Sequence, residues 1–396
     1  MKKLLILSTH LGTINRGAET FVLELVNYLK HEYEITIATA YAYELDGIIV
    51  KTFPVQRSFF SKLHETLYNK NFIYRTVCNK LYYPIPDCLF QKQFNEQVYE
   101  WLLETDATFD LLFVNNGIYG CKMASAYRAK TGTLFVVTGH GGIGFGEELM
   151  LKTNPDAYVA LSASQLRWGR QYIEANRILH ISNGIDTKRF TTAVDSEGGK
   201  TSSDTMPTVL CVGALTKFKR HLLAIDAVSL LDSVKLLIVG RGELREQIYS
   251  YGKSKLGDRF ALKEVPYEAM PQIYKSASVF TLPSKNEPFG IVYLEALASG
   301  VPVVAPNDEV RQTIVGDAGI LCDCTDAKAY AVALADCLAR DWGTLPLKQA
   351  ATFDWSFISQ QYICLLYPSD AADDTPCVAL RCRRIIKQKT HIADHT

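Results

Sequence analysis

The 396-residue chain lacks several features that would assign it quickly to a class of protein. It has no run of about 18 uninterrupted apolar residues, so no membrane-spanning helix is expected. Lys and Arg together number 42, as do Asp and Glu, and this balance gives no reason to expect nucleic acid as a partner. The 10 cysteines are scattered without zinc-finger or redox spacing, which fits a reducing cytosol.

The start of the sequence is not expected to be a secretion signal. A basic beginning precedes an apolar run, but the run stops at Ser8 and no small-residue cleavage site follows it. The segment therefore predicts a first buried β-strand. With 48% hydrophobic and 21% charged residues, the composition is that of a globular protein, and the length favours two domains.

Short apolar runs alternate with helical stretches, which is the pattern of parallel sheets with crossover helices. We therefore predict an α/β protein with two doubly wound domains and a ligand at the carboxyl ends of the strands. The strands expected in the first half are residues 3–8, 35–38, 111–114, 134–138, 157–161 and 178–181. Those expected in the second half are residues 208–212, 234–239, 260–264, 279–282 and 301–305.

The segment most informative about function is residues 283–304, P-S-K-N-E-P-F-G-I-V-Y-L-E-A-L-A-S-G-V-P-V-V. Glu287 and Pro288 are expected at the N-cap and first position of a helix that ends at Gly300. That helix is apolar on every face except at Glu295, whose buried carboxylate would need a partner.

The start of the same helix predicts an anion site, because amides there have no partner within the helix. A phosphorylated, polyhydroxylated ligand would satisfy both these amides and Glu295. The alternative is a capped helix whose Glu295 meets a neighbouring Arg. The amides concerned are those of Phe289, Gly290, Ile291 and Val292.

E-P-F-G-I-V-Y-L-E resembles the Glu-x7-Glu motif of retaining, nucleotide-sugar-dependent glycosyltransferases of family 4 (glycosyl transferases group 1). The resemblance implies the GT-B fold, two Rossmann-like domains facing each other across a cleft. It implies that Glu287 is catalytic and holds sugar hydroxyls of the donor, and that Glu295 holds the nucleotide ribose. The amides that follow Phe289 would hold the sugar and its diphosphate.

Residues 208–227 resemble the family's opening strand, glycine turn and basic cluster. Many members carry Arg directly after the glycine, where this chain has Ala214. Lys219 and Arg220 remain, and the resemblance places them on the donor diphosphate, whose charge grows as the glycosidic bond breaks. A solvated basic turn is the alternative interpretation.

In the first half, residues 11–20 resemble the family's glycine loop over the donor phosphates. Only Gly17 of the usual glycine pair is present, and a plain turn between strand and helix is the alternative. Residues 139–144, G-H-G-G-I-G, satisfy the dinucleotide pattern G-x-G-x-x-G, but the next strand does not end in the acidic residue that this fingerprint needs. The resemblance instead makes His140 a catalytic-site residue facing the sugar's anomeric carbon. A satisfied structural histidine is the alternative.

Residues 56–86 are rich in basic and aromatic side chains. One interpretation is peripheral contact with the inner membrane surface that holds a lipid-linked acceptor. The other is an ordinary helix pair with a solvated basic face. Residues 363–396 have no period of helix or strand and resemble translated sequencing-adapter read-through, with a natural disordered tail as the alternative.

These interpretations imply an order of domains along the chain. Residues 1–190 are expected to form the acceptor-side domain, and the Ser/Thr/Gly/Asp-rich residues 191–207 a linker. Residues 208–350 would form the donor domain and residues 351–362 a closing helix. Residues 363–396 would then be a non-native or disordered tail.

The activity that the resemblance implies is transfer of a sugar, with retention, from a nucleoside-diphosphate sugar to an acceptor hydroxyl. The acceptor is expected to be a glycan or lipid-linked molecule of polysaccharide or glycolipid synthesis, met in the cytoplasm or at the cytoplasmic membrane face. No Asp-x-Asp occurs, so Lys219, Arg220 and the helix start would replace a metal, and no cofactor is expected. A GT-B epimerase or phosphorylase, and a non-catalytic nucleotide-sugar-binding scaffold, are the alternatives.

Overall fold

A computed structural model describes residues 1–12, 17–55, 86–105, 107–191, 206–285 and 287–366. The chain divides into two compact units, each described here by itself. The first contains Met1–Leu161, Gln165–Ile181 and the chain from Ser359 on, and the second contains Ser162–Ser164 and Ser182–Ile358. The basic and aromatic segment, most of the expected linker and most of the expected tail lie outside the described residues.

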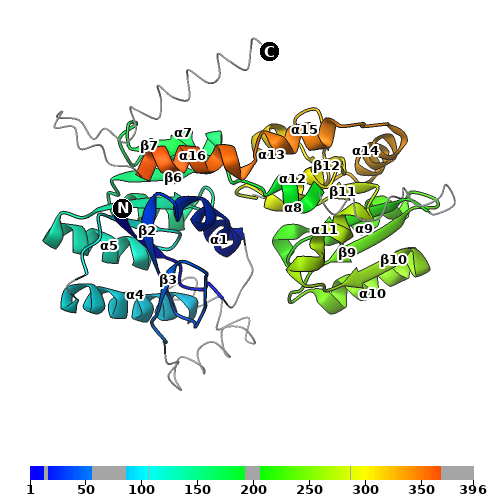
Figure 1. The fold of residues 1–396 in the computed structure, drawn as a ribbon. Helices are drawn as coiled ribbons and strands as arrows, with labels where there is room; N and C mark the ends of the chain where they lie inside the picture. Colours follow the sequence, from blue (N-terminus) through cyan, green and yellow to red (C-terminus); the bar gives the residue numbers. More distant parts are fainter. Residues whose placement is uncertain (13–16, 56–85, 106, 192–205, 286, 367–396) are drawn as a thin grey trace, which may run out of the picture. The chain divides into compact units, whose positions relative to one another are not determined.

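The first unit is built on a seven-stranded parallel sheet of order β3-β2-β1-β4-β5-β6-β7 (Figure 1). Apart from β3 at one edge, its strands are largely buried because helices cover both faces of the sheet. The strands are β1 (Lys2–Leu7), β2 (Tyr33–Thr39), β3 (Ile49–Thr52), β4 (Leu111–Val114), β5 (Leu134–Gly139), β6 (Ala157–Ala160) and β7 (Ile178–His180). The helices are α1 (Gly17–Leu29), α4 (Pro86–Glu104), α5 (Ile118–Thr131), α6 (Phe145–Leu151), α7 (Ala163–Gly169) and the later part of α16 (Trp355–Leu366).

Side chains alternate across this sheet and form a core on each face. Leu5, Leu112 and Val114 pack in one cluster with Phe94 of α4 and other side chains of α4 and α5. On the other face, Phe113 lies against Phe21 of α1, with ring centroids 6.4 Å apart, and against Tyr362 of α16, at 6.2 Å. Strand order reverses between β1 and β4, so the carboxyl ends of these two strands form the usual place for a ligand.

The second unit carries a six-stranded parallel sheet of order β10-β9-β8-β11-β12-β13 (Figure 1). Its strands are β8 (Thr208–Val212), β9 (Lys235–Val239), β10 (Phe260–Lys263), β11 (Val279–Thr281), β12 (Val303–Pro306) and β13 (Gly319–Cys322). Its α-helices are α8 (Thr187–Thr191), α9 (His221–Ser229), α10 (Arg245–Leu256), α11 (Met270–Lys275), α12 (Ile291–Ala298), α13 (Glu309–Val315), α14 (Ala327–Ala339) and α15 (Leu345–Ala351). Three short 3₁₀ helices are η2 (Lys217–Lys219), η3 (Gly257–Arg259) and η4 (Tyr267–Ala269). Strand order reverses between β8 and β11.

The predicted fold class, two doubly wound α/β domains, is confirmed. The strands predicted from apolar runs are all present, with ends that move by a residue or two. Two strands were not predicted. β3 and β13 lie at sheet edges and are largely exposed or half-buried, so their sequences, I-V-K-T and G-I-L-C, carry no long apolar run.

The closing helix differs from the prediction. α16 runs to Leu366 rather than ending at Tyr362, and both Leu365 and Leu366 are buried. The expectation that residues 363–396 follow no helical period is therefore wrong for the last turn of this helix. Across the described residues, none of the helices combines the length and the apolar character that crossing a membrane requires.

Candidate active site

Lys219 and Glu287 lie at the carboxyl ends of neighbouring strands of the second sheet. Lys219 closes η2, in the loop after β8, and Glu287 lies in the loop after β11. The Lys219 Nζ forms an ion pair with the Glu287 Oε2, and the two side chains are 23% and 13% exposed. Two residues that the sequence assigned separately to the diphosphate and to the sugar are therefore in direct contact.

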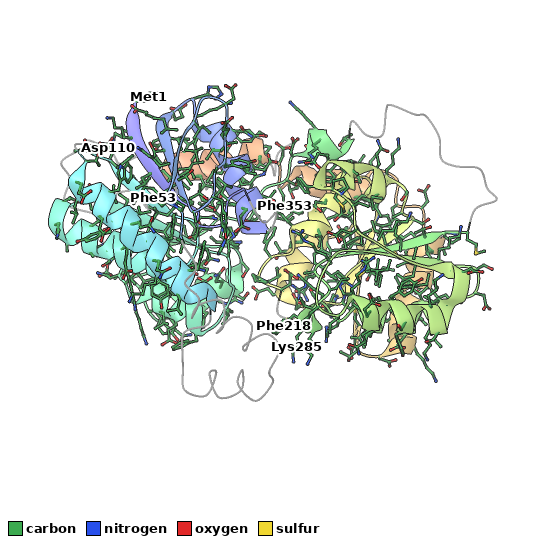
Figure 2. The ribbon with its side chains drawn as sticks, turned by 90° about the horizontal axis from the view of Figure 1, so that it is seen from below. Met1, Phe53, Asp110, Phe218, Lys285 and Phe353 are labelled. Carbon is green, nitrogen blue, oxygen red and sulfur yellow. The ribbon has the colours of Figure 1, made fainter. Side chains whose placement is uncertain are left out.

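Arg220 lies in the first of these loops and forms a hydrogen bond to the second. It has a left-handed backbone, with φ of +52°, a conformation that costs a side-chain-bearing residue energy. Its Nε donates to the carbonyl of Pro283 at 2.6 Å, and the amide of Lys285 donates to the carbonyl of Phe218 at 2.9 Å. Figure 2 labels Phe218 and Lys285, the residues from the two loops that meet here. The Arg220 guanidinium is thus partly engaged in a hydrogen bond to the protein backbone.

The turn after β8 has a second support that the sequence analysis missed. The Nε2 of His221 lies 3.1 Å from the carbonyl of Ala214, and its Nδ1 lies 3.3 Å from the Cys211 thiol. Because Nε2 must be protonated to donate to a carbonyl, Nδ1 is the acceptor for the thiol. Burial lowers the pKa of His221 to about 4, so this histidine is neutral and holds the residue that replaces the family's Arg.

The start of α12 differs from the prediction. The helix begins at Ile291, and its N-cap is Gly290, whose φ is +95°. Glu287 and Pro288 are therefore not the N-cap and first position. Glycine is required at position 290, since an added Cβ would also lie 2.7 Å from the Tyr293 ring.

Of the four amides expected at this helix start, two lie in its first turn. Ile291 and Val292 are half-buried and occupy the first two helical positions, where an amide has no partner within the helix. Phe289 precedes the helix, and its buried ring packs edge-on against Phe353, with centroids 6.2 Å apart. The anion site predicted here therefore keeps two of its four expected amides in the first turn of the helix.

Glu295 is buried in α12, as predicted, with 4% exposure. Its partner is a tyrosine, because the Tyr274 hydroxyl of α11 donates to Oε2 at 2.6 Å. Burial raises the pKa of Glu295 to about 6, against the opposing effects of the Tyr274 hydrogen bond and the positive charge of Arg189. Tyr274 was not anticipated, although a buried tyrosine hydroxyl usually has a hydrogen-bond partner.

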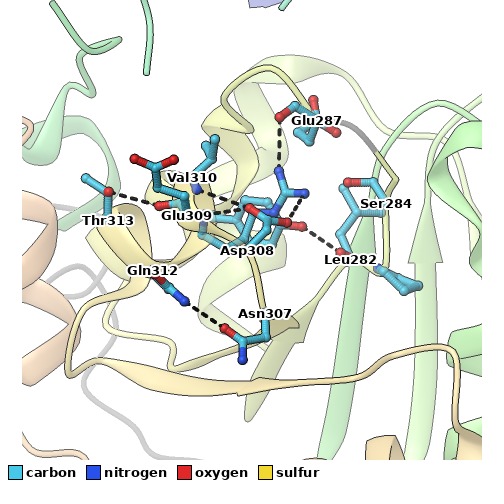
Figure 3. Close-up of polar contacts among 12 residues, drawn as sticks. Leu282, Ser284, Glu287, Asn307, Asp308, Glu309, Val310, Gln312 and Thr313 are labelled. Atoms are coloured by element: carbon cyan, nitrogen blue, oxygen red, sulfur yellow. Dashed lines mark hydrogen bonds and ion pairs between the residues drawn. The ribbon is translucent and has the colours of Figure 1, made fainter. Parts of the chain in front are cut away.

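Arg311 is a further residue that the sequence analysis missed. Only 2% exposed, it donates from Nη1 to the carbonyl of Glu287 at 3.0 Å and pairs through Nη2 with Asp308 Oδ2 at 2.5 Å (Figure 3). Asp308 in turn caps α13 by accepting from the amides of Val310 and Arg311. Within the described part of the chain, the Arg311 Nε has no hydrogen-bond partner. A charged residue inside the first turn of a helix after a buried strand is the signal that could have found it.

In the first unit, His140 directly follows β5 and is tied to its neighbours. Its Nε2 lies 3.0 Å from Asn115 Oδ1, and the Asn115 Nδ2 donates to the carbonyl of Ala18 at 2.9 Å. Since the Asn115 amide nitrogen is the donor to Ala18, its oxygen accepts from His140, which places the proton on Nε2. Burial lowers the pKa of His140 to about 3, so the ring is neutral with Nδ1 as the unprotonated nitrogen.

Gly17 is the first residue of α1. An added Cβ there would meet no described atom within 4 Å, and Gly17 does not have a positive φ. The described part of the protein itself therefore does not require glycine at this position. Residues 13–16, the rest of the expected glycine loop, lie outside the described residues.

Comparison with known proteins shows which protein families the two halves of the chain match. The description "Glycosyltransferase Family 4" matches residues 15–189, and "Glycosyl transferases group 1" matches residues 196–350. The chain is 29% identical over 212 residues to a D-inositol 3-phosphate glycosyltransferase of Corynebacterium urealyticum, covering 47% of this chain and 50% of that protein. It is 31% identical over 219 residues to a phosphatidyl-myo-inositol mannosyltransferase of Mycolicibacterium smegmatis, covering 51% and 55%. The chain thus spans about half the length of the curated relatives it matches.

Among solved structures, Anabaena HepE in complex with UDP and glucose superposes with a TM-score of 0.68. The match covers 92% of this chain and 98% of that one, at 17% sequence identity. At such identity the likeness concerns the fold.

Proposed function

We propose that this chain, which belongs to the glycosyltransferases of Family 4 and group 1, moves a sugar from a nucleoside diphosphate to an acceptor hydroxyl with retention at the anomeric carbon. The observation that carries the proposal is the Lys219–Glu287 ion pair beside a helix with a buried Glu295. Lys219, Glu287 and Glu295 are proposed to bind the diphosphate, the sugar and the ribose, and they lie on the loops after two neighbouring strands, β8 and β11, and on the helix α12.

Donor binding is proposed to exchange the partners of the ion pair. The donor's diphosphate would take the Lys219 ammonium, and the released Glu287 carboxylate would accept hydrogen bonds from sugar hydroxyls. The amides of Gly290, Ile291 and Val292 would supply uncharged donors to the same anion. Arg311 would keep the Glu287 backbone in place during this exchange, because it binds the carbonyl and not the carboxylate.

As the glycosidic bond breaks, negative charge grows on the leaving diphosphate, and Lys219 and Arg220 are proposed to stabilise it in place of a metal. In the mechanism that the family resemblance implies, departure and attack occur on the same face of the sugar, and a donor phosphate oxygen takes the acceptor's proton. No protein nucleophile is then needed. His140, a neutral ring with Nδ1 as an acceptor, is proposed to contact a sugar hydroxyl.

The acceptor is proposed to be a glycan or a lipid-linked molecule, reached in the cytoplasm or at the cytoplasmic face of a membrane. The names of relatives that act on inositol phosphate and phosphatidyl-myo-inositol support this class. Residues 56–86 are proposed as the membrane contact, residues 1–190 as the acceptor side and residues 208–350 as the donor side. No nucleic-acid partner is proposed.

The donor is identified by screening UDP-, GDP- and ADP-sugars for a rise in melting temperature, because a ligand that binds only the folded state stabilises it. Turnover of each stabilising donor is then measured with sugar and lipid acceptors, with Glu287→Gln as the matched inactive variant. A protein that binds a donor but never turns it over would be a scaffold rather than an enzyme. One that binds none of the donors would overturn the proposal.

A further inference from the structure

The loop that carries His140, residues 139–144, rests on three buried polar side chains. We call it the histidine loop. The side chains are Glu147 of α6, Tyr158 of β6 and Gln165 of α7, exposed by 3%, 0% and 1%. All three belong to the first unit together with the loop.

These side chains bind the backbone on both sides of His140. Glu147 Oε1 accepts from the amide of Gly141 at 2.6 Å, and its Oε2 accepts from the Tyr158 hydroxyl. Gln165 Nε2 donates to Tyr158 at 2.9 Å and to the carbonyl of Gly139 at 2.9 Å. The residue before His140 and the residue after it are thus joined through one buried hydrogen-bond network.

The glycines of the loop are explained by this network. An added Cβ at Gly139 would overlap the Tyr158 hydroxyl, and one at Gly141 would lie 2.8 Å from Glu147 Oε1. Gly142 has a φ of +78°, which favours glycine for a conformational reason. The G-x-G-G pattern therefore brings backbone close to a buried carboxyl.

A carboxyl in this position is costly for the fold. Burial raises the pKa of Glu147 to about 7, and the groups that lower it are the Tyr158 hydroxyl and the Gly141 amide rather than any Lys or Arg. Burial, and after it the charge of Glu147, raises the pKa of the Cys121 thiol of α5. The other charges of α6 and its end, Glu148 and Lys152, pair with each other. An amide or an apolar side chain would fill the same space without this cost.

We propose that Glu147 is a positioning residue for His140. By holding the Gly141 amide directly and the Gly139 carbonyl through Tyr158 and Gln165, it fixes the backbone from which the imidazole reaches Asn115. The ring then keeps its proton on Nε2 and presents Nδ1 as an acceptor. This inference rests on the proposed function, in which His140 contacts the donor sugar.

The test compares Glu147→Ala and Glu147→Gln with Glu148→Gln, a matched control at the next position of the same helix. Glu147→Ala is expected to lower kcat at least tenfold with a smaller effect on KM for the donor. Glu147→Gln should keep part of the activity, because its amide oxygen can still accept from Gly141. Glu148→Gln should match the wild type in both constants.

A double-mutant cycle separates positioning from a general structural role. In a His140→Ala background, Glu147→Ala should cost little further activity, because its effect acts through the missing ring. Equal losses in both backgrounds would overturn the proposal. The wild-type rate should also fall as pH drops through about 7, where Glu147 gains a proton, and this dependence should be absent in Glu147→Gln.

Amide hydrogen exchange provides a readout that does not need activity. Exchange in the histidine loop should accelerate in Glu147→Ala and in Tyr158→Phe, a milder variant that removes only the hydroxyl, and stay unchanged in Glu148→Gln. If no donor is turned over, the proposed function fails. The exchange measurement still tests whether Glu147 stabilises the histidine loop. Unchanged loop exchange in both variants would overturn the inference.

Discussion

Glu287 and Glu295 have different surroundings, and each surrounding predicts a different defect on mutation. Glu287 is paired with Lys219 in a loop, whereas Glu295 is buried in α12 against Tyr274. Glu287→Gln is expected nearly to abolish turnover while nucleotide binding survives, because its proposed partners are sugar hydroxyls. Glu295→Gln should instead weaken binding of the nucleoside diphosphate, whose ribose is its proposed partner. Calorimetry with the free nucleotide and a turnover assay check both, and the reverse result would contradict the assignment.

Lys219 and Arg220 are expected to stabilise the leaving group. Replacing either one by Ala should lower kcat/KM by a factor that corresponds to a loss of about 2–4 kcal/mol of transition-state stabilisation. The two variants should differ in stability, because Arg220 also binds the carbonyl of Pro283. Arg220→Ala should therefore lower the melting temperature more than Lys219→Ala.

The same leaving-group proposal predicts that activity persists in EDTA, since Lys219, Arg220 and the start of α12 supply the positive charge. Turnover is measured before and after chelation and after adding manganese. Activity that disappears with EDTA and returns with manganese would show that a metal, not these cations, supports the reaction.

At the scale of a single helix, α12 is expected to make nucleotide binding depend on pH. Burial raises the pKa of Glu295 to about 6, above its ordinary value of 4.5. The contribution of protonated Glu295 to the stability of the fold is therefore fully present below the pKa of this residue in the unfolded chain, and it is lost as pH rises through about 6. The affinity for the nucleotide should change with pH in the opposite direction, because the ribose is proposed to bind the ionised carboxylate of Glu295.

Nucleotide affinity should accordingly fall as pH drops below about 6 in the wild type. Calorimetric titrations between about pH 5 and pH 8 measure this, and Glu295→Gln corrects for protonation of the ligand's own phosphate. An identical pH dependence in the wild type and the variant would show that Glu295 does not bind the ribose.

The elements also show what a sequence can predict. Strands buried on both faces are long apolar runs and were predicted, whereas the edge strands β3 and β13 were not. The start of α12 was misplaced because Gly290, rather than Glu287, is the cap, and the sequence alone does not reveal a left-handed glycine.

For the candidate site, the sequence singled out the motif residues, which remain predictions, but not the side chains that contact them. Asn115, Tyr274 and Arg311 lie far along the chain from His140, Glu295 and Glu287, and only the folded sheets bring each pair together. A local pattern can single out such a residue, as the charge in the first turn of α13 does for Arg311, but it does not reveal which side chain or backbone group that residue contacts. The pairing of Lys219 with Glu287 was missed for the same reason.

For the whole molecule, the last turn of α16 decides where the chain can be shortened. Leu365 and Leu366 are buried, and burying a leucine side chain stabilises a protein by about 1.5–3 kcal/mol. A chain ending at Tyr362 is expected to melt at a lower temperature than one ending at Leu366. Thermal unfolding of the two truncated proteins beside the full sequence measures this, and equal melting temperatures would show that the final turn contributes nothing.

The ion pair between Lys219 and Glu287 also bears on how the reaction ends. In the proposed reaction, the nucleoside diphosphate would still hold Lys219 once the sugar has left, while Glu287 would have lost the hydroxyls bound to it. The carboxylate would then compete with the product for the same ammonium group. Re-forming the ion pair would help to expel the spent nucleotide, so the loop proposed to bind the donor would also promote product release, a step that limits turnover in many enzymes.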